Sequence, residues 1–286
     1  MRIIERPDVA QQLLDLARKQ RPGRHKGWHQ SDVNGCLRQA VVKKLIDRDD
    51  IEIEEGLDLM FLRGEGIHHF LAEGKPELVF EAEGVGWCSV DRLWEDEAGD
   101  TSPMELKSTR YSSAYPITEH ANYIVQLSTY MVKMLHMNHI EVEPAKEYKG
   151  YLYVMYEMGD YATRFPEQRC FQLLISGTEL LKWEEILRQR YSQLRTSYDE
   201  LSGFFTQPGN EMELEKLRDL VAVDVDLTSM LPPLAAHWGF QCEYCSIKEL
   251  ISCEGTKHNA EYGNPFFVEE AKYTKEHKER KAKKVK

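Results

Sequence analysis

Two charged residues, Glu105 and Lys107 in the stretch PMELKST, are the first candidates for chemistry in this chain. The stretch is expected to form a short strand, and side chains two positions apart in a strand point to the same side. The carboxylate and the ammonium group therefore share one surface. Taken alone, an E-x-K pair is most simply a solvated ion pair, so a catalytic role for it requires further functional residues nearby.

Asp91 is expected near the end of a neighbouring strand, where its carboxylate and that of Glu105 could reach the same ion. Hydrolysis of a phosphodiester uses a divalent cation to neutralise the phosphate and to lower the pKa of the attacking water, and hard cations prefer carboxylate oxygens. Lys107 would then orient or deprotonate that water, or stabilise charge that develops on the phosphate. These three residues together predict a metal-dependent phosphodiesterase site.

Three further residues fall where such a site needs them. His68, in GEGIH, is expected on the helix that precedes the strands, and an imidazole ligand suits manganese or iron better than magnesium. Gln126 and Tyr130, in QLSTY, are four apart and share one helix face, from which they could hold a lysine, a water or the phosphate. The simpler alternatives are a surface or capping role for His68 and ordinary packing for Gln126 and Tyr130.

The elements that position these residues follow from the periodicity of the sequence. Apolar residues at helical spacing predict helices over residues 8–20, 31–46, 54–74, 117–139 and 176–201. Alternating apolar residues predict two paired strands within 77–96, a third strand at 103–109 and a fourth at 149–158. This order of elements predicts one α/β domain with helical additions.

Composition narrows the class of protein. A chain of 286 residues that is 42% hydrophobic and 30% charged can bury a sizeable core. It has no apolar run of about 18 residues and no signal-peptide core, so we expect a cytoplasmic protein with no membrane partner. The net charge of -11 argues against non-specific coating of nucleic acid, although a single groove can still be basic.

Three cysteines crowd the C-terminal part of the chain as C-x2-C-x7-C, a spacing unlike a secreted disulfide framework; they are Cys242, Cys245 and Cys253. They predict a metal centre that needs one more ligand. If that ligand is Cys36, four thiolates suit a 4Fe-4S cluster that ties the N-terminal helices to the C-terminal segment. If it is His258, the centre is a local Cys3His zinc site. Spacing alone leaves both alternatives open.

The order of the motifs GEGIH, GWCSVD, ELK and QLSTY resembles the RecB-like branch of the PD-(D/E)XK nuclease superfamily, across roughly residues 60–131. The resemblance implies ligands for Mn²⁺ or Mg²⁺ at His68, Asp91 and Glu105. It also implies that Lys107 is the catalytic lysine, and that Gln126 and Tyr130 form the supporting Q-x-x-x-Y motif. Val90 stands where the superfamily name expects proline.

One cysteine before these motifs and three after them is similar to the pattern of iron-sulfur nucleases, both the CRISPR-associated Cas-four type and the nuclease halves of AddB-type helicases. The resemblance therefore favours the 4Fe-4S cluster, with ligands Cys36, Cys242, Cys245 and Cys253. It implies a restriction-endonuclease-like fold, a mixed sheet flanked by helices, with its N- and C-terminal helical segments joined by the cluster.

The same resemblance implies one nuclease domain over 1–270, followed by a basic tail at 271–286. Within the domain we expect an N-terminal helical segment, a catalytic core, a helical region and a cysteine segment, at 1–55, 56–160, 161–235 and 236–270. The implied activity is that of a DNA exonuclease acting on single-stranded ends, with CRISPR, replication or recombination proteins as further partners. The alternatives are a non-catalytic assembly subunit that keeps the fold and a zinc-containing nucleic-acid-binding protein.

Several other residues have predicted roles around such a site. Aromatic side chains that could stack on unpaired bases are Tyr111, Tyr115 and Trp94. Cationic side chains that could contact backbone phosphates are Lys107, Arg110 and Lys133. The two cysteines left outside the metal centre are expected as buried thiols, Cys88 and Cys170.

Overall fold

A computed structural model describes the part of the chain that carries the predicted strands and two of the long helices, namely residues 27–45, 64, 66, 78–162 and 165–205. The predicted helix at 8–20 lies outside these residues, as do the cysteine segment 236–270, the basic tail 271–286 and, apart from residues 64 and 66, the predicted helix at 54–74.

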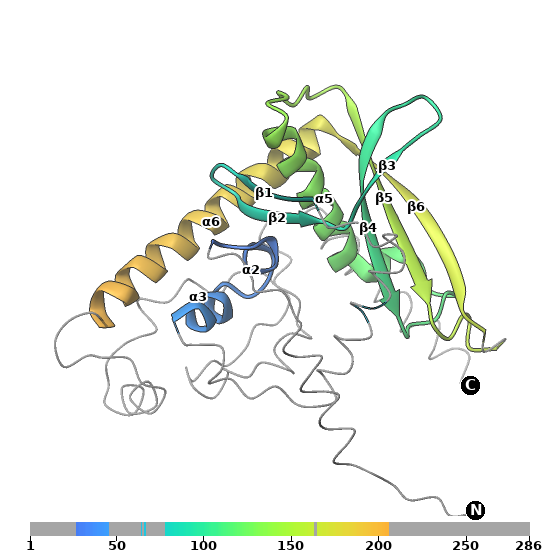
Figure 1. Ribbon diagram of the computed structural model, residues 1–286, viewed down its shortest axis with the longest axis horizontal. Coiled ribbons are helices and arrows are strands. Elements are labelled where there is room, and N and C mark those ends of the chain that lie inside the picture. The colour runs from blue at the N-terminus through green and yellow to red at the C-terminus, as the bar shows by residue number, and fades with distance from the viewer. Residues whose placement is uncertain (1–26, 46–63, 65, 67–77, 163–164, 206–286) are drawn as a thin grey trace, which may run out of the picture.

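A four-stranded mixed sheet forms the centre of the described structure (Figure 1). Its strands, in spatial order, are β3 (Arg92–Glu95), β4 (Thr101–Thr109), β5 (Glu147–Tyr156) and β6 (Glu167–Ser176). The central strands β4 and β5 are parallel, and the two outer pairings are antiparallel. A separate two-stranded antiparallel sheet precedes it, made of β1 (Leu78–Ala82) and β2 (Gly86–Val90).

The connection between the parallel strands β4 and β5 is helical, as parallel pairing requires a crossover. A 3-10 turn, η2 (Ile117–His120), leads into α5 (Ala121–Met137), which packs across β4 and β5. Helix and strand come close at Gly150, where an added Cβ would lie 3.0 Å from the Leu127 Cδ1 atom. The crossover therefore holds one face of α5 against β4 and β5.

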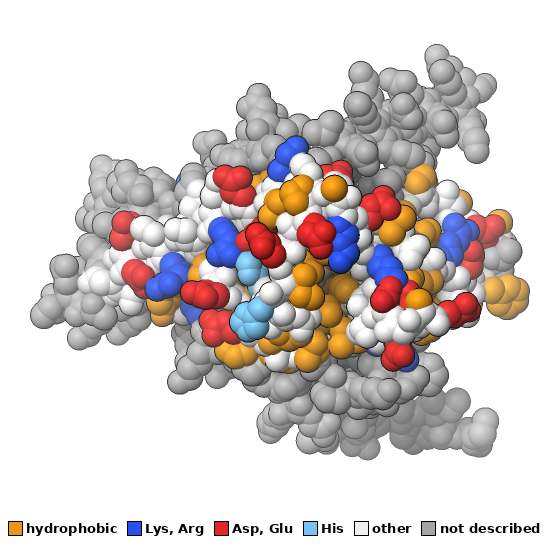
Figure 2. Space-filling view, turned by 90° about the horizontal axis from the view of Figure 1, so that it is seen from above, with side chains coloured by type: hydrophobic (Ala, Val, Ile, Leu, Met, Phe, Trp, Pro, Cys, Tyr) orange, Lys and Arg blue, Asp and Glu red, His pale blue; other side chains and the backbone are white. Residues whose placement is uncertain are grey.

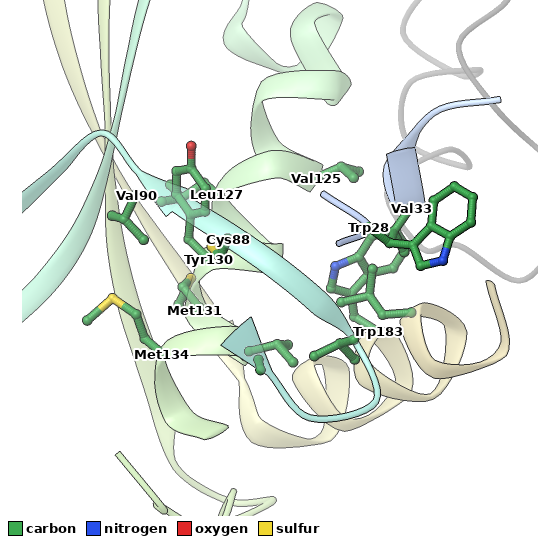
Figure 3. Packing of buried hydrophobic residues seen from close by; sticks show 14 of the residues in the cluster. Trp28, Val33, Cys88, Val90, Val125, Leu127, Tyr130, Met131, Met134 and Trp183 are labelled. Carbon is green, nitrogen blue, oxygen red and sulfur yellow. The ribbon is translucent and has the colours of Figure 1, made fainter. Parts of the chain in front are cut away.

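Helices cover the outer side of α5. The long helix α6 (Gly177–Phe205) packs against α5 and against α3 (Leu37–Leu45), with the short α2 (Gln30–Asn34) beside them. The main apolar core lies between these helices, the β1–β2 pair and the sheet, and Figure 3 shows part of it, including Cys88 and Val90 of β2 with Leu127 and Tyr130 of α5. The predicted mixed sheet flanked by helices is confirmed.

Two predicted elements are divided in the structure. The helix predicted over 31–46 is two helices, because Gly35 takes an extended conformation after α2, which begins at Gln30 rather than near Ser31. The second of the two strands predicted within 77–96 is also two strands, since the chain bends at Asp91 and passes from the β1–β2 pair into the main sheet. The strand β6 was not predicted.

None of the helices within residues 27–45, 78–162 and 165–205 combines the length and the apolar content that crossing a membrane requires.

Candidate metal-dependent active site

Asp91 lies at the bend between β2 and β3 and reaches across to β4. Its Oδ2 atom accepts a hydrogen bond of 2.8 Å from the backbone N–H of Leu106. That amide stands between Glu105 and Lys107 in the chain, so the Asp91 carboxylate is anchored beside both of them. The bend that was not predicted is therefore what brings the first carboxylate to the site.

Gln126 and Tyr130 contact this carboxylate from α5. The Tyr130 hydroxyl donates to Asp91 Oδ1 at 3.4 Å, and the Gln126 side-chain amide donates to the Tyr130 hydroxyl at 3.1 Å. Both residues lie on one helix face, as predicted from their spacing. They form a short hydrogen-bonded chain that ends on Asp91 and fixes its orientation.

Glu105 and Lys107 lie on the same side of β4, also as predicted, and the Lys107 ammonium group forms an ion pair with Glu105 Oε1. The Glu105 side chain is 0% exposed. Within the described part of the chain, neither of its buried carboxylate oxygens accepts a hydrogen bond of ordinary geometry. Burying a carboxylate costs free energy unless a positive charge compensates it. The burial of the Glu105 side chain therefore suits a residue that binds a cation.

Burial and charge shift the pKa values of these groups. Burial and, to a smaller extent, the Asp91 charge together raise the pKa of Glu105 to about 8, because Lys107 offsets only part of their effect. Burial acts to lower the pKa of Lys107, but the carboxylates of Glu105 and Asp91 outweigh it and the net shift is upward. Burial raises the pKa of Tyr130 well above its usual value. At neutral pH the lysine is therefore charged, and the raised pKa of Glu105 means that a proton competes with a cation for its carboxylate.

The donor set fits a hard divalent cation. Asp91 at the β2–β3 bend and Glu105 of β4 supply carboxylate oxygens, and Mg²⁺ and Mn²⁺ are bound by one or two carboxylates together with water and phosphate oxygens. The predicted third ligand, His68, lies outside the described residues. Within the described ranges no group of three or more His, Cys, Asp or Glu side chains gathers in the way a complete protein-ligated metal site would.

Sequence reasoning missed two residues next to Lys107. The Tyr123 ring faces the Lys107 ammonium group at 5.7 Å, and the His120 ring stacks on Tyr123 with 4.9 Å between ring centroids. The signal was available, since Tyr123 lies three positions before Gln126 and seven before Tyr130, the spacing of a single helix face.

Cys36 lies in the turn between α2 and α3, and its side chain is partly exposed. Buried Arg190 of α6 holds this turn, because its Nε donates to the Val33 carbonyl at 2.6 Å and its Nη2 to the Gly35 carbonyl. The Asn34 amide of the same turn donates to the Thr129 hydroxyl of α5 at 3.1 Å. The turn is thus fixed to the helix that carries Tyr130.

The other predicted ligands of the metal centre lie outside the described residues: Cys242, Cys245, Cys253 and the alternative His258. The choice between an iron-sulfur and a zinc centre therefore stays a prediction.

Two cysteine predictions have different outcomes. Cys88 is buried as predicted, and its thiol donates to the Gln30 side-chain carbonyl at 3.2 Å. The prediction of a buried thiol at Cys170 is wrong, because Cys170 lies on the edge strand β6 and is exposed.

Two of the predicted nucleic-acid contacts are also corrected. Lys133 is fully buried and its ammonium group donates to the Trp87 carbonyl at 2.9 Å, so it cannot reach a phosphate. Trp94 is exposed but packs edge-on against Tyr151, on the side of the sheet where Met104 and Leu106 lie. Since side chains alternate along a strand, that side is opposite to Lys107.

The part of Figure 2 that is coloured by side-chain type shows no extended basic patch. Acidic and basic side chains alternate over this part of the face. Ion pairs among the described residues have the same mixed character, such as Lys149 with Asp96 and Asp100, and Arg188 with Glu184. The described part of this face therefore presents no continuous row of positive charge for a phosphate backbone.

The comparisons with known proteins do not identify a family for this chain. No family model and no curated protein matches the sequence. A solved structure titled "Crystal structure of SSO0001" is similar over 71% of this chain and 98% of that chain, with 14% sequence identity and a TM-score of 0.39. A similarity of this extent carries no argument about the activity.

Proposed function

We propose that this protein is a Mn²⁺- or Mg²⁺-dependent DNA nuclease that acts on single-stranded ends. One observation carries the proposal: a buried carboxylate, Glu105, lies in ion-pair contact with Lys107 and close to a second carboxylate, Asp91, that is anchored on the same strand. Two carboxylates and a lysine in this arrangement suit the hydrolysis of a phosphodiester.

The roles of the residues follow from their environments. A bound divalent cation would neutralise the phosphate and lower the pKa of the attacking water. Asp91, oriented by the Leu106 amide and by Tyr130, would bind the cation together with Glu105 once Glu105 loses its proton. Because the pKa of Lys107 is raised, its ammonium group stays charged at neutral pH. We therefore assign Lys107 to stabilising charge on the phosphate and orienting the water, rather than to removing a proton.

The resemblance to iron-sulfur nucleases extends the proposal to the fold, the metal cluster and the partners. The parallel pair β4–β5 with the α5 crossover is compatible with a restriction-endonuclease-like core. A 4Fe-4S cluster with ligands Cys36, Cys242, Cys245 and Cys253 would join the α2–α3 turn to the C-terminal segment. A protein with such a cluster would work in a reducing compartment such as the cytoplasm, with CRISPR, replication or recombination proteins as partners.

The test is degradation of end-labelled single-stranded DNA in the presence of Mn²⁺, with the wild type compared with Lys107→Ala. We expect degradation by the wild type and a loss of 100-fold or more, on the order of an oxyanion-stabilising group, in the variant. Lys182→Ala, which removes an exposed lysine of α6, is the matched control and should be as active as the wild type. Binding of DNA without degradation by the wild type would contradict the proposal and favour a non-catalytic assembly subunit.

A further inference from the structure

Three aromatic rings lead from Lys107 to the protein surface, and we call Tyr123, His120 and Tyr111 the aromatic stack. The Tyr123 ring faces the Lys107 ammonium group, and His120 lies nearly parallel to Tyr123, with 6° between the ring planes. The Tyr111 ring meets His120 edge-on, with 4.9 Å between centroids. His120 is buried and Tyr123 is partly buried, whereas Tyr111 is 58% exposed.

The His120 ring is buried between the rings of Tyr123 and Tyr111. Its side chain is only 4% exposed, and within the described ranges its buried Nε2 atom has no hydrogen-bond partner. Burying an unpaired ring nitrogen has a cost, and burial also lowers the pKa of His120 to about 4, so that the ring is neutral at physiological pH. A neutral ring held between two tyrosines acts as a rigid support for the outer one.

The backbone around Tyr111 is fixed as well. Its own N–H donates to the Thr109 hydroxyl at 3.2 Å, directly after the end of β4. The Tyr161 hydroxyl donates to the carbonyl of Arg110 at 2.7 Å. An exposed tyrosine with a fixed backbone and a supported ring loses little conformational entropy on binding, which is the property of a preorganised contact residue.

We propose that Tyr111 stacks on an unpaired base of the DNA strand whose phosphate lies at Lys107, and thereby selects single strands. This inference rests on the proposed nuclease function and specifies its substrate.

Stacking on aromatic side chains is the usual way in which proteins hold single strands without reading their sequence, since every base has a π-face. In a duplex, neighbouring base pairs cover those faces. Exposed Arg110, next to Tyr111 in the chain, is placed to contact the backbone of the same strand.

The charge of the protein supports stacking as the main source of affinity. A chain with a net charge of -11 gains little from general attraction to phosphates. Binding that depends on stacking is expected to weaken less with salt than binding that depends on many phosphate contacts.

The test uses single-stranded oligonucleotides with fluorescent 2-aminopurine near one end or the other, at neutral pH and without added divalent cation, so that the strand is bound without being cut. Stacking on Tyr111 quenches the fluorescence. We expect Tyr111→Leu to lose the quenching and to bind about 5- to 150-fold more weakly, the effect of removing one base–aromatic stack. Tyr111→Phe, which keeps the ring, should quench and bind as the wild type does.

Trp94→Leu is the matched control, because Trp94 is also an exposed aromatic residue, at 41%, but lies on the opposite side of the sheet. Its affinity and quenching should equal those of the wild type. If Tyr111→Leu binds and quenches like a wild type that degrades DNA in Mn²⁺, the inference about Tyr111 is wrong and the nuclease proposal stands. If the wild type neither binds nor degrades single strands, the nuclease proposal itself is wrong.

Discussion

Binding of a divalent cation should release a proton from Glu105. Burial raises the pKa of this carboxyl group from its ordinary value of 4.5 to about 8. A glutamate side chain binds a metal ion as the deprotonated carboxylate, so the proton has to leave Glu105 when the cation binds. In the metal-free protein near neutral pH, a proton therefore competes with the cation for the Glu105 carboxylate.

The size of the effect follows from that pKa. At pH 7.5, a group with a pKa of about 8 is protonated in roughly three-quarters of the molecules, so binding should release about 0.75 proton. Below pH 8 the apparent affinity for Mn²⁺ should fall about tenfold for each pH unit, or about 1.4 kcal/mol. Above pH 8 the affinity should become nearly independent of pH.

Calorimetric titration of Mn²⁺ at pH 7.5, in two buffers with different enthalpies of protonation, counts the protons directly. A histidine of ordinary pKa is already about nine-tenths neutral at this pH and adds little. Glu105→Gln should bind weakly and release none of this proton, whereas Glu185→Gln, an exposed change on α6, should behave as the wild type. Tight binding by the wild type with no proton release would refute the reasoning, since Glu105 would then be ionised despite its burial.

Three other changes test the supporting structure. Tyr130→Phe removes the hydroxyl that donates to Asp91 and should lower the rate of DNA cleavage about 10- to 100-fold, with an unchanged melting temperature, as measured in a single-turnover assay with Mn²⁺. Arg190→Ala leaves two carbonyls at the α2–α3 turn without their charged donor, and it should lower the free energy of unfolding by about 2–4 kcal/mol, as measured by urea denaturation. A loss below about 0.5 kcal/mol, that of an ordinary surface change, would contradict this role of Arg190. Anaerobically purified wild type should be brown and Cys36→Ser should lose the iron absorbance, whereas a colourless wild type that contains zinc would favour the Cys3His alternative.

The sequence was sufficient where the pattern is local. Alternation along PMELKST placed Glu105 and Lys107 on one side of β4, and the spacing of four placed Gln126 and Tyr130 on one face of α5. These relations depend only on the periods of strand and helix, so they needed no knowledge of the partners.

The sequence was insufficient where a distant contact decides the local conformation. The bend at Asp91 is held by the amide of Leu106, which belongs to another strand. The interruption of the helix predicted over 31–46 is held by Arg190, which lies far along the chain on α6. In each case a distant side chain makes a hydrogen bond with a backbone group that would otherwise be paired within a regular helix or sheet. The local sequence pattern does not predict such a contact.

The strand β6 had a readable pattern that was overlooked. Phe171, Leu173 and Ile175 alternate with more exposed residues, which is the period of a half-covered strand. Its position at the edge of the sheet also explains why Cys170 is exposed, since the outward side chains of an edge strand need no apolar partner. Tyr111 of the aromatic stack was predicted as a stacking residue, but its contact with His120 was not, because that contact joins the end of β4 to the start of α5 through side chains alone.

The most direct test of the central claim is a Mn²⁺ binding isotherm, followed by the electron paramagnetic resonance signal of the free ion. If Asp91 and Glu105 share one cation, the wild type binds one ion at this site, and Asp91→Asn and Glu105→Gln each weaken its binding by about tenfold or more, because each removes a charged oxygen ligand. If both variants bind Mn²⁺ with the affinity of the wild type, the two carboxylates do not form a metal site and the proposed nuclease chemistry is wrong.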